Sequence, residues 1–287
     1  MDPALFTMKF LTTLLIFLST VTAVLATGKR GLLYDYTVQD ANPNAIKTVI
    51  DNNVQFNRVA NWNTWYPLNL DNRIPFVPTI RTPDQLQGRD WDWAWHSNGP
   101  EVIYYNEPER NHVTPEDAAN MWFSHMIPLR QQTGKKLVGP GIANDDNGRR
   151  WLDRFMSLIG NQRPDYLGLH VYETDGNRAI RYMQDMHQKY NLPLYITEIA
   201  SVHRSYIDVL FFTSQLIYWM DNTPWIERYF FFGWMPHLPN DGGFASPTAQ
   251  LMNSDTSFRD LFWKIMCDDV IQTTKHDVEL GENHPYY

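Results

Sequence analysis

Eight short apolar runs recur along the chain, and their number and spacing most strongly constrain its fold. Most of them are apolar throughout rather than alternating with polar residues, which is typical of parallel strands covered on both faces. Segments of helical periodicity lie between the runs, and this alternation predicts βαβ units. The runs are residues 31–36, 57–62, 74–80, 101–107, 136–142, 166–172, 193–200 and 228–235. Eight such units predict an α/β fold, a (β/α)8 TIM barrel, which typically needs about 250 residues.

The segments between the runs are unequal in length. The clearest helical pattern opens with Thr114 and Pro115, a capped start, and closes at Gly134. Only residues 62–73 separate the second run from the third, which is too few for a regular barrel helix. We therefore expect at least one helix, between strands two and three, to be missing or degenerate. Helices are predicted over residues 43–52, 114–133, 148–159, 177–190, 204–221 and 255–267.

The first residues of the chain do not fit the barrel pattern. Residues 8–26 carry Lys9, then a short apolar run, then small residues ending at Ala26, which predicts a secretory signal peptide. A membrane anchor is the alternative, but the apolar run is shorter than a bilayer span of about 20 residues. Residues 1–7 are interpreted as a leader or an alternative start. The protein is therefore expected to be secreted, to the extracellular space or the cell wall, without a membrane attachment once the signal is removed.

The remainder is expected to be one catalytic barrel domain over residues 27–267, followed by a polar, unpatterned tail at 268–287. Cys267 is the only cysteine, so no internal disulfide is possible. A core of this size can be stable without one. We expect the protein to act as a monomer.

Charge and composition exclude several classes of partner. The formal net charge of −8 argues against nucleic acid, whose binding depends on neutralising phosphates. Aromatic residues make up 14% of the chain, with 11 tryptophans, which favours a cleft for a neutral ligand. The histidines lack metal-ligand spacing, and the sequence contains no phosphate-binding glycine loop and no Gly-x-Ser-x-Gly elbow. No metal or cofactor is expected.

Two glutamates at strand ends need an explanation that packing does not supply. Glu107 and Glu198 close the fourth and seventh predicted strands, at the rim where barrel active sites lie. Strand alternation places Glu107 on the face of Tyr105, and Glu198 on the face of Ile196. Burying a carboxylate is costly unless it is paired, and a pair of carboxylates is what glycoside hydrolysis requires. Structural, ion-paired rim residues are the alternative.

The residues around this pair resemble a known family. Asn106-Glu107-Pro108 ending strand four, with Glu198 ending strand seven, looks like the clan A retaining glycoside hydrolases. The HVY at 170–172, the TEIA at 197–200 and the FGWM at 232–235 resemble glycoside hydrolase family 128, whose members are endo- or exo-acting β-1,3-glucanases. The resemblance covers roughly residues 30–265 and implies that Glu107 is the general acid/base and Glu198 the nucleophile.

The two roles require one protonated and one ionised carboxyl. Glu107 lies beside the apolar Tyr105 and Pro108, which we expect to keep it protonated. Asn106 is predicted to bond a sugar 2-hydroxyl. We predict that Tyr172 holds the nucleophile through its hydroxyl, with His170 beside it as a further binding residue, although both also have packing interpretations.

Aromatic and polar residues near other strand ends complete the candidate site. Trp234 is the predicted platform under the sugar at the cleavage point. Asp35, Asn61 and Trp62 are predicted sugar contacts. Each of these has a packing alternative. A loop predicted after strand three carries Trp91, Trp93 and Trp95. These tryptophans have two interpretations: they line glucan subsites, or they form a small hydrophobic cluster over the barrel. The rim residues Glu109 and Glu173 are the carboxylates most easily confused with the catalytic pair.

The sequence therefore predicts a secreted enzyme that cleaves β-1,3-glucan with retention through two glutamates. A barrel that binds β-glucan without cleaving it, as a lectin would, is the alternative from another class. A clan A hydrolase for another β-glycan, such as cellulose or mannan, is the closer alternative. Endo or exo action depends on loop shapes and stays open.

Overall fold

A computed structural model describes residues 28–52, 56–239 and 245–266 of the chain. The predicted leader and signal peptide, and the predicted polar tail, lie outside these residues. Within them, no helix combines the length and the apolar character that crossing a membrane requires.

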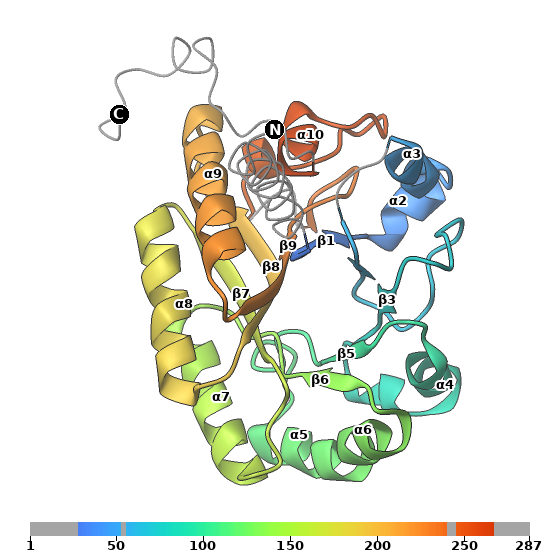
Figure 1. The fold of residues 1–287 in the computed structure, drawn as a ribbon, viewed down its shortest axis with the longest axis vertical. Helices are drawn as coiled ribbons and strands as arrows, with labels where there is room; N and C mark the ends of the chain where they lie inside the picture. The colour runs from blue at the N-terminus through green and yellow to red at the C-terminus, as the bar shows by residue number, and fades with distance from the viewer. Residues whose placement is uncertain (1–27, 53–55, 240–244, 267–287) are drawn as a thin grey trace, which may run out of the picture.

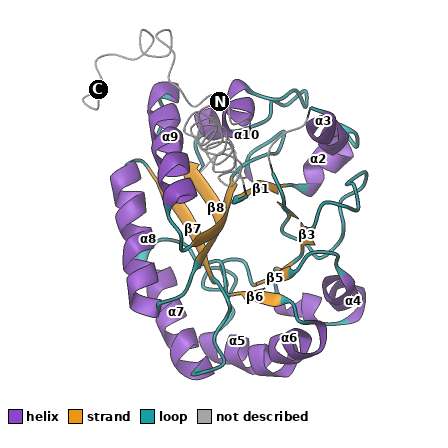
Figure 2. Cartoon of the chain, in the orientation of Figure 1, coloured by secondary structure: helices purple, strands orange, loops and turns teal. Residues whose placement is uncertain are grey.

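Parallel strands surround a central axis and helices lie outside them (Figures 1 and 2). One sheet has the strand order β3-β2-β1-β9-β8-β7, and a second has the order β4-β5-β6. The strands are β1 (Arg30–Leu33), β2 (Val59–Ala60), β3 (Phe76–Val77), β4 (Thr79–Ile80), β5 (Glu101–Tyr104), β6 (Lys136–Val138), β7 (Leu167–Glu173), β8 (Leu194–Ser201) and β9 (Ile226–Phe231).

Pro78 divides the third predicted strand into two pieces. Proline has no N–H to donate to a sheet ladder, so the strand is interrupted there. The piece before Pro78 pairs with β2 and the piece after it pairs with β5. Single parallel bridges, Val138 to Tyr166 and Ile142 to Leu169, connect the β6 side to the β7 side. Counting β3 and β4 as one strand gives the eight predicted strands, and the (β/α)8-type fold is confirmed.

The helices cover the outside of this ring. They are α2 (Tyr36–Ala41), α3 (Ala45–Asp51), α4 (Gly88–His96), α5 (Pro115–Met121), the π-helix η2 (Trp122–Met126), α6 (Ile127–Thr133), α7 (Asp146–Ile159), α8 (Gly176–Tyr190), α9 (Tyr206–Asn222) and α10 (Asp260–Met266), with 3-10 turns η1 (Pro83–Leu86) and η4 (Pro247–Ala249).

The predicted helix 114–133 is continuous but contains a π-helical turn. Thr114 caps it by accepting a hydrogen bond from Asp117 N at 3.1 Å, and Gly134 ends it with φ of 73°. The π turn lies just before Pro128. A proline ring inside an α-helix clashes with the carbonyl four residues earlier, so the wider turn removes the conflict.

The helix predicted to be missing is missing. Residues 61–75, between β2 and β3, form turns and no helix. In contrast, α2 and α4 were not predicted, because each is short and lies in a loop rich in polar residues. The predicted helix 255–267 begins only at Asp260.

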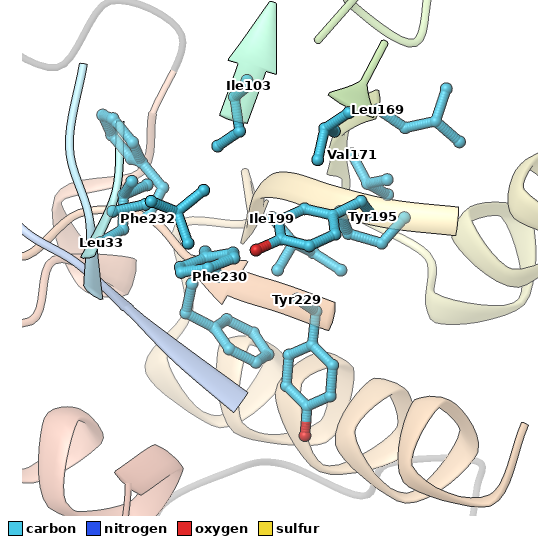
Figure 3. Close-up of a cluster of buried hydrophobic side chains, with 14 of the residues drawn as sticks. Leu33, Ile103, Leu169, Val171, Tyr195, Ile199, Tyr229, Phe230 and Phe232 are labelled. Carbon is cyan, nitrogen blue, oxygen red and sulfur yellow. The ribbon is translucent and has the colours of Figure 1, made fainter. Parts of the chain in front are cut away.

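Apolar side chains from strands on all sides of the ring form one buried cluster (Figure 3). Leu33, Ile103, Leu169 and Ile199 come from four different strands and are each less than 5% exposed. Gly31 allows the ring of Phe230 to pack against the backbone of β1, because a Cβ there would lie 2.0 Å from that ring. The filled interior holds the strand ends, and therefore the rim, in place.

Candidate active site

A cavity of about 410 Å³ opens at the carboxyl-terminal rim of the barrel. Five of the nine residues predicted from the sequence line it, and Phe232, which was not predicted, lines it too. The five are Asp35, Trp62, Asn106, Glu107 and Glu198. These five residues, predicted at separate strand ends, therefore meet at one cavity.

Glu107 reaches the cavity through an unusual backbone turn rather than through strand alternation. Strand β5 ends at Tyr104, after which Tyr105 and Glu107 have φ of 53° and 40°. These angles lie in the left-handed region that residues other than glycine rarely adopt. The rings of Tyr104 and Tyr105 stack at 3.9 Å, so consecutive side chains do not alternate here. Strand alternation, on which the predicted shared face of Tyr105 and Glu107 rests, therefore does not apply to this turn.

Backbone hydrogen bonds to Gly141 hold this turn against its strain. Glu107 N donates to Gly141 O at 2.8 Å, and Gly141 N donates to Tyr105 O at 3.0 Å. Asn111 adds a third restraint by donating from Nδ2 to Asn106 O at 2.7 Å. The Glu107 carboxyl is thus carried on a rigid segment, as a catalytic group must be.

Glu198 is held from both of its oxygens. The Tyr172 hydroxyl donates to Oε2 at 2.6 Å, and Trp62 Nε1 donates to Oε1 at 2.6 Å. Burial and the neighbouring carboxylates raise the pKa of Tyr172 well above its ordinary value, so its hydroxyl keeps the proton it donates. The predicted Tyr172–Glu198 contact is present. The Trp62 bond was missed, since Trp62 was expected only to touch sugar.

His170 lies between the two carboxylates. Its Nδ1 is 3.0 Å from Glu107 Oε1 and its Nε2 is 3.4 Å from Glu198 Oε1. A register shift in the β7–β8 pairing places His170 directly opposite Glu198. Gly141 leaves the space, because a Cβ there would be 2.7 Å from Nε2. His170 is only 1% exposed, so its predicted role as a sugar contact is replaced by a bridge behind the carboxylates.

The electrostatic interactions among Glu107, His170 and Glu198 oppose the expected protonation of Glu107. Burial raises the pKa of Glu107, but the hydrogen bond and charge of His170, with the charge of Arg110, outweigh it and lower that pKa. Burial lowers the pKa of His170, but the charge of Glu198 and the bond to Glu107 outweigh it and raise that pKa. Both shifts favour the proton on His170 over Glu107, which is the opposite of the expectation that Tyr105 and Pro108 keep Glu107 protonated.

Trp234 is not a sugar platform. Its side chain is fully buried, stacked on Phe258 at 5.7 Å and packed against Tyr34 at 5.2 Å. The aromatic residue of the same strand end that lines the cavity is Phe232, whose ring contacts Trp62 and Tyr172, each at 5.7 Å. Strand β9 ends at Phe231, so alternation does not decide between the two positions.

The side chains of Asn61 and Asp35 both form hydrogen bonds with nearby backbone. Asn61 is 1% exposed and bonds the backbone of Trp65 and Asn63, so it shapes the turn after β2 and its predicted sugar contact is wrong. Asp35 lines the cavity but also caps α2, accepting from Thr37 N at 2.9 Å. Arg81 and His237 line the cavity and were missed, because neither lies in an apolar run.

The two rim carboxylates most easily confused with Glu107 and Glu198 have other partners. Glu109 Oε1 accepts from Ala143 N at 2.8 Å, and burial raises the pKa of Glu109. Glu173 pairs with Arg178 at 2.6 Å. Neither lines the 410 Å³ cavity. Among the residues that the structure describes, no group of three or more His, Cys, Asp or Glu side chains is arranged to hold a metal ion.

The three tryptophans after strand three lie on a helix, not in a loop. Trp91 and Trp95 contact each other at 5.6 Å and pack against the core. Trp93 lies on another side of α4 and is 40% exposed. None of the three lines the cavity at the rim.

The bridging imidazole predicts how stability depends on pH. Because the pKa of His170 is raised on folding, the folded protein retains a proton above pH 6.5 that the unfolded chain releases. This stabilisation is complete below about pH 6.5 and is lost as the pH rises through the folded pKa, at up to about 1.4 kcal/mol per pH unit. We expect His170→Gln to show a smaller loss of unfolding free energy above pH 6.5 than the wild type, measured by urea unfolding at several pH values. Equal slopes in the two proteins would show that His170 is neutral in the folded state.

Comparison with known proteins places the chain among carbohydrate-cleaving enzymes. A family model described as glycosyl hydrolase catalytic core matches residues 31–264. A subgroup VI exo-β-1,3-glucanase of glycoside hydrolase family 128 from Aureobasidium namibiae is 42% identical, with a TM-score of 0.80 over 85% of this chain and 97% of that one. A subgroup V exo-β-1,3-glucanase from Cryptococcus neoformans is 25% identical, with a TM-score of 0.71 over 83% of this chain and 98% of that one.

A curated relative is longer. Alkali-sensitive linkage protein 1 of Schizosaccharomyces pombe is 26% identical over 218 residues, which are 71% of this chain and 38% of that protein. The chain thus spans well under half the length of this relative.

Proposed function

Because the chain belongs to the glycosyl hydrolase catalytic core family, and within it to glycoside hydrolase family 128, we propose that it hydrolyses β-1,3-glucan with retention of the anomeric configuration. One observation carries the mechanism. Glu107 and Glu198 come from two separate strand ends, line one cavity and contact opposite nitrogens of the same imidazole. Carboxylates on the two sides of one bond are what double displacement requires.

In the first step, Glu198 attacks the anomeric carbon. A bond forms between a Glu198 oxygen and that carbon, the glycosidic C–O bond breaks, and the leaving oxygen takes a proton from Glu107. The Tyr172 and Trp62 bonds orient the nucleophile. In the second step Glu107 removes a proton from water, whose oxygen displaces Glu198 from the anomeric carbon and restores both carboxyls.

The proton for the leaving oxygen comes from the His170–Glu107 pair. The raised pKa of His170 and the lowered pKa of Glu107 favour the proton on His170 in the free protein, and His170 Nδ1 is 3.0 Å from Glu107 Oε1. A neutral sugar that fills the cavity excludes water, which favours the neutral imidazole and the neutral carboxylic acid over the ion pair. Substrate binding thus favours transfer of the proton from His170 Nδ1 to the Glu107 carboxyl, which then donates it to the leaving oxygen.

The cleavage mode follows from the relative of highest identity reported above. The Aureobasidium namibiae protein is an exo-β-1,3-glucanase. We propose that this chain also removes sugar from chain ends, and that it acts outside the cell, the latter from the signal-like residues 8–26.

Incubation of the protein with laminarin tests the proposal. Proton NMR of the first products is expected to show the β-anomer before mutarotation, and chromatography is expected to show one small product from the earliest times. The α-anomer appearing first would contradict retention, and a ladder of oligosaccharides would contradict exo action. Binding of laminarin without product would favour the lectin-like alternative, and faster hydrolysis of cellulose or mannan would reassign the substrate.

A further inference from the structure

A second cavity, of about 430 Å³, lies on the flank of the barrel where the helix between β2 and β3 is missing. Its walls are the turn-rich segment 61–75 on one side and helix α4 on the other. The same segment separates it from the active site: Trp62 and Asn63 line the catalytic cavity, whereas Thr64 and Tyr66 line this one. The two cavities share no lining residue.

Two exposed aromatic rings line this flank cavity. Trp93 is 40% exposed and Tyr66 is 37% exposed. Trp91 and Trp95 of the same helix pack against the core, but Trp93 does not, so packing of the core does not explain a tryptophan at this position. Its Nε1 has no hydrogen-bond partner among the described residues, and the guanidinium of Arg89 lies over its ring at 5.7 Å from the centroid, so a ligand would stack on the part of the ring that Arg89 leaves exposed. An exposed indole with an unused N–H is suited to a ligand that has both an apolar face and hydroxyl groups.

Segment 61–75 forms this cavity wall without a helix, and side-chain contacts hold it in place. The Tyr66 hydroxyl donates to Asp71 O at 3.0 Å, and the Tyr66 ring packs edge-on against Phe76 at 5.6 Å. Asn98 ties segment 61–75 to the start of β5, donating to Asn72 O at 2.9 Å and accepting from Phe76 N at 2.8 Å. The Tyr66 ring is therefore oriented before a ligand arrives, which lowers the entropic cost of binding.

The polar groups and the charge indicate a neutral ligand. Asn72, Asp92 and His96 lie around the two rings, and Asp92 and His96 face each other at 3.2 Å. Side-chain amides, carboxylates and imidazoles are suitable partners for sugar hydroxyls. A protein of net charge −8 repels polyanions, and no cluster of Lys or Arg lines this cavity to offset it.

We propose that the flank cavity binds a segment of β-1,3-glucan, with Trp93 and Tyr66 as stacking surfaces. The inference rests on the proposed function for the identity of the polymer. Segment 61–75 forms part of the wall of both cavities, so a chain held on the flank keeps its other parts near the active site. Such tethering raises the effective substrate concentration for a long polymer and has no effect on a sugar too short to reach both cavities.

The test compares a long and a short substrate. Trp93→Ala is expected to weaken binding to insoluble β-1,3-glucan (curdlan) about tenfold, measured by co-sedimentation in a Glu198→Ala background that prevents digestion. A tenfold change equals about 1.4 kcal/mol, the size of a good aromatic stacking contact. In the otherwise wild-type protein, activity on curdlan should fall about fivefold or more, whereas kcat/KM on laminaritriose should stay within twofold. Trp93→Phe should retain part of the binding.

Tyr218→Ala is the matched control, since Tyr218 is 75% exposed on α9, away from this cavity. It should leave both substrates unaffected, and equal melting temperatures will confirm that the variants fold. Equal losses on curdlan and laminaritriose, or no loss on either, would overturn the proposal. Stronger Trp93-dependent binding to cellulose or mannan would overturn the ligand class. A wild type that cleaves no glucan but binds curdlan through Trp93 would refute the proposed catalysis and support the site.

Discussion

Glu198→Ala is expected to lower kcat on laminarin by about 10⁴-fold, which corresponds to about 5.5 kcal/mol of transition-state stabilisation. The reason is that the covalent intermediate needs an oxygen at this position, and Trp62 and Tyr172 orient only that oxygen pair. Binding of laminari-oligosaccharide, measured by calorimetry, should change by less than tenfold. The affinity persists because the other cavity residues still contact the sugar.

Chemical rescue distinguishes loss of the nucleophile from loss of structure. Azide fits the space of the missing carboxylate and attacks the anomeric carbon of an activated aryl β-glucoside directly, releasing the aryl group. The product expected from Glu198→Ala is the α-glucosyl azide, identified by NMR. Glu173→Gln changes a rim carboxylate that pairs with Arg178 outside the cavity, and it should keep near-normal activity. A β-glucosyl azide from Glu198→Ala would mean that another residue is the nucleophile.

Glu107→Gln is expected to reduce hydrolysis of laminarin by about 10²- to 10⁴-fold, the range that general acid catalysis contributes. The loss should depend on the leaving group. An aryl β-glucoside with an acidic phenol departs without protonation, so its first step is nearly unaffected, and a burst of phenol should precede a slow steady state. Stopped-flow absorbance measures both phases.

Glu109→Gln is the matched control for this variant. Glu109 is half-buried on the same segment but bonds Ala143 N rather than His170. We expect it to show no leaving-group dependence. If Glu107→Gln slowed the burst phase on the activated glucoside by the same factor as hydrolysis of laminarin, Glu107 would not be the acid.

The fold was predictable because its signals are local and repeated. Apolar runs at regular spacing define the strands, and the short interval 62–73 was enough to predict the missing helix. The positions of Glu107 and Glu198 followed from the same pattern, since the carboxyl ends of barrel strands meet at one rim.

The contacts inside the site were less predictable, because they depend on departures from regular structure. The left-handed turn at Tyr105 and Glu107, and the register shift that brings His170 opposite Glu198, have no periodic signature. The sequence also favoured Trp234 as the sugar platform, because an indole stacks well on a sugar ring, whereas Trp234 is buried in the core and Phe232 lines the cavity. The direction in which the pKa of Glu107 shifts was mispredicted for a related reason: its sequence neighbours are apolar, but its neighbour in space is an imidazole.

The contact of His170 with both glutamates depends on the absence of a Cβ atom at Gly141. A methyl group there would lie 2.7 Å from His170 Nε2 and 2.8 Å from Thr197 Oγ1, closer than real Cβ atoms come to other groups. The imidazole would have to move away from one carboxylate, and the acid and the nucleophile would no longer share a counter-ion. Glycine has no side-chain functional group, so a search for reactive side chains does not find Gly141. Divergent relatives can therefore keep both glutamates and still lose the electrostatic coupling between them through a single added carbon.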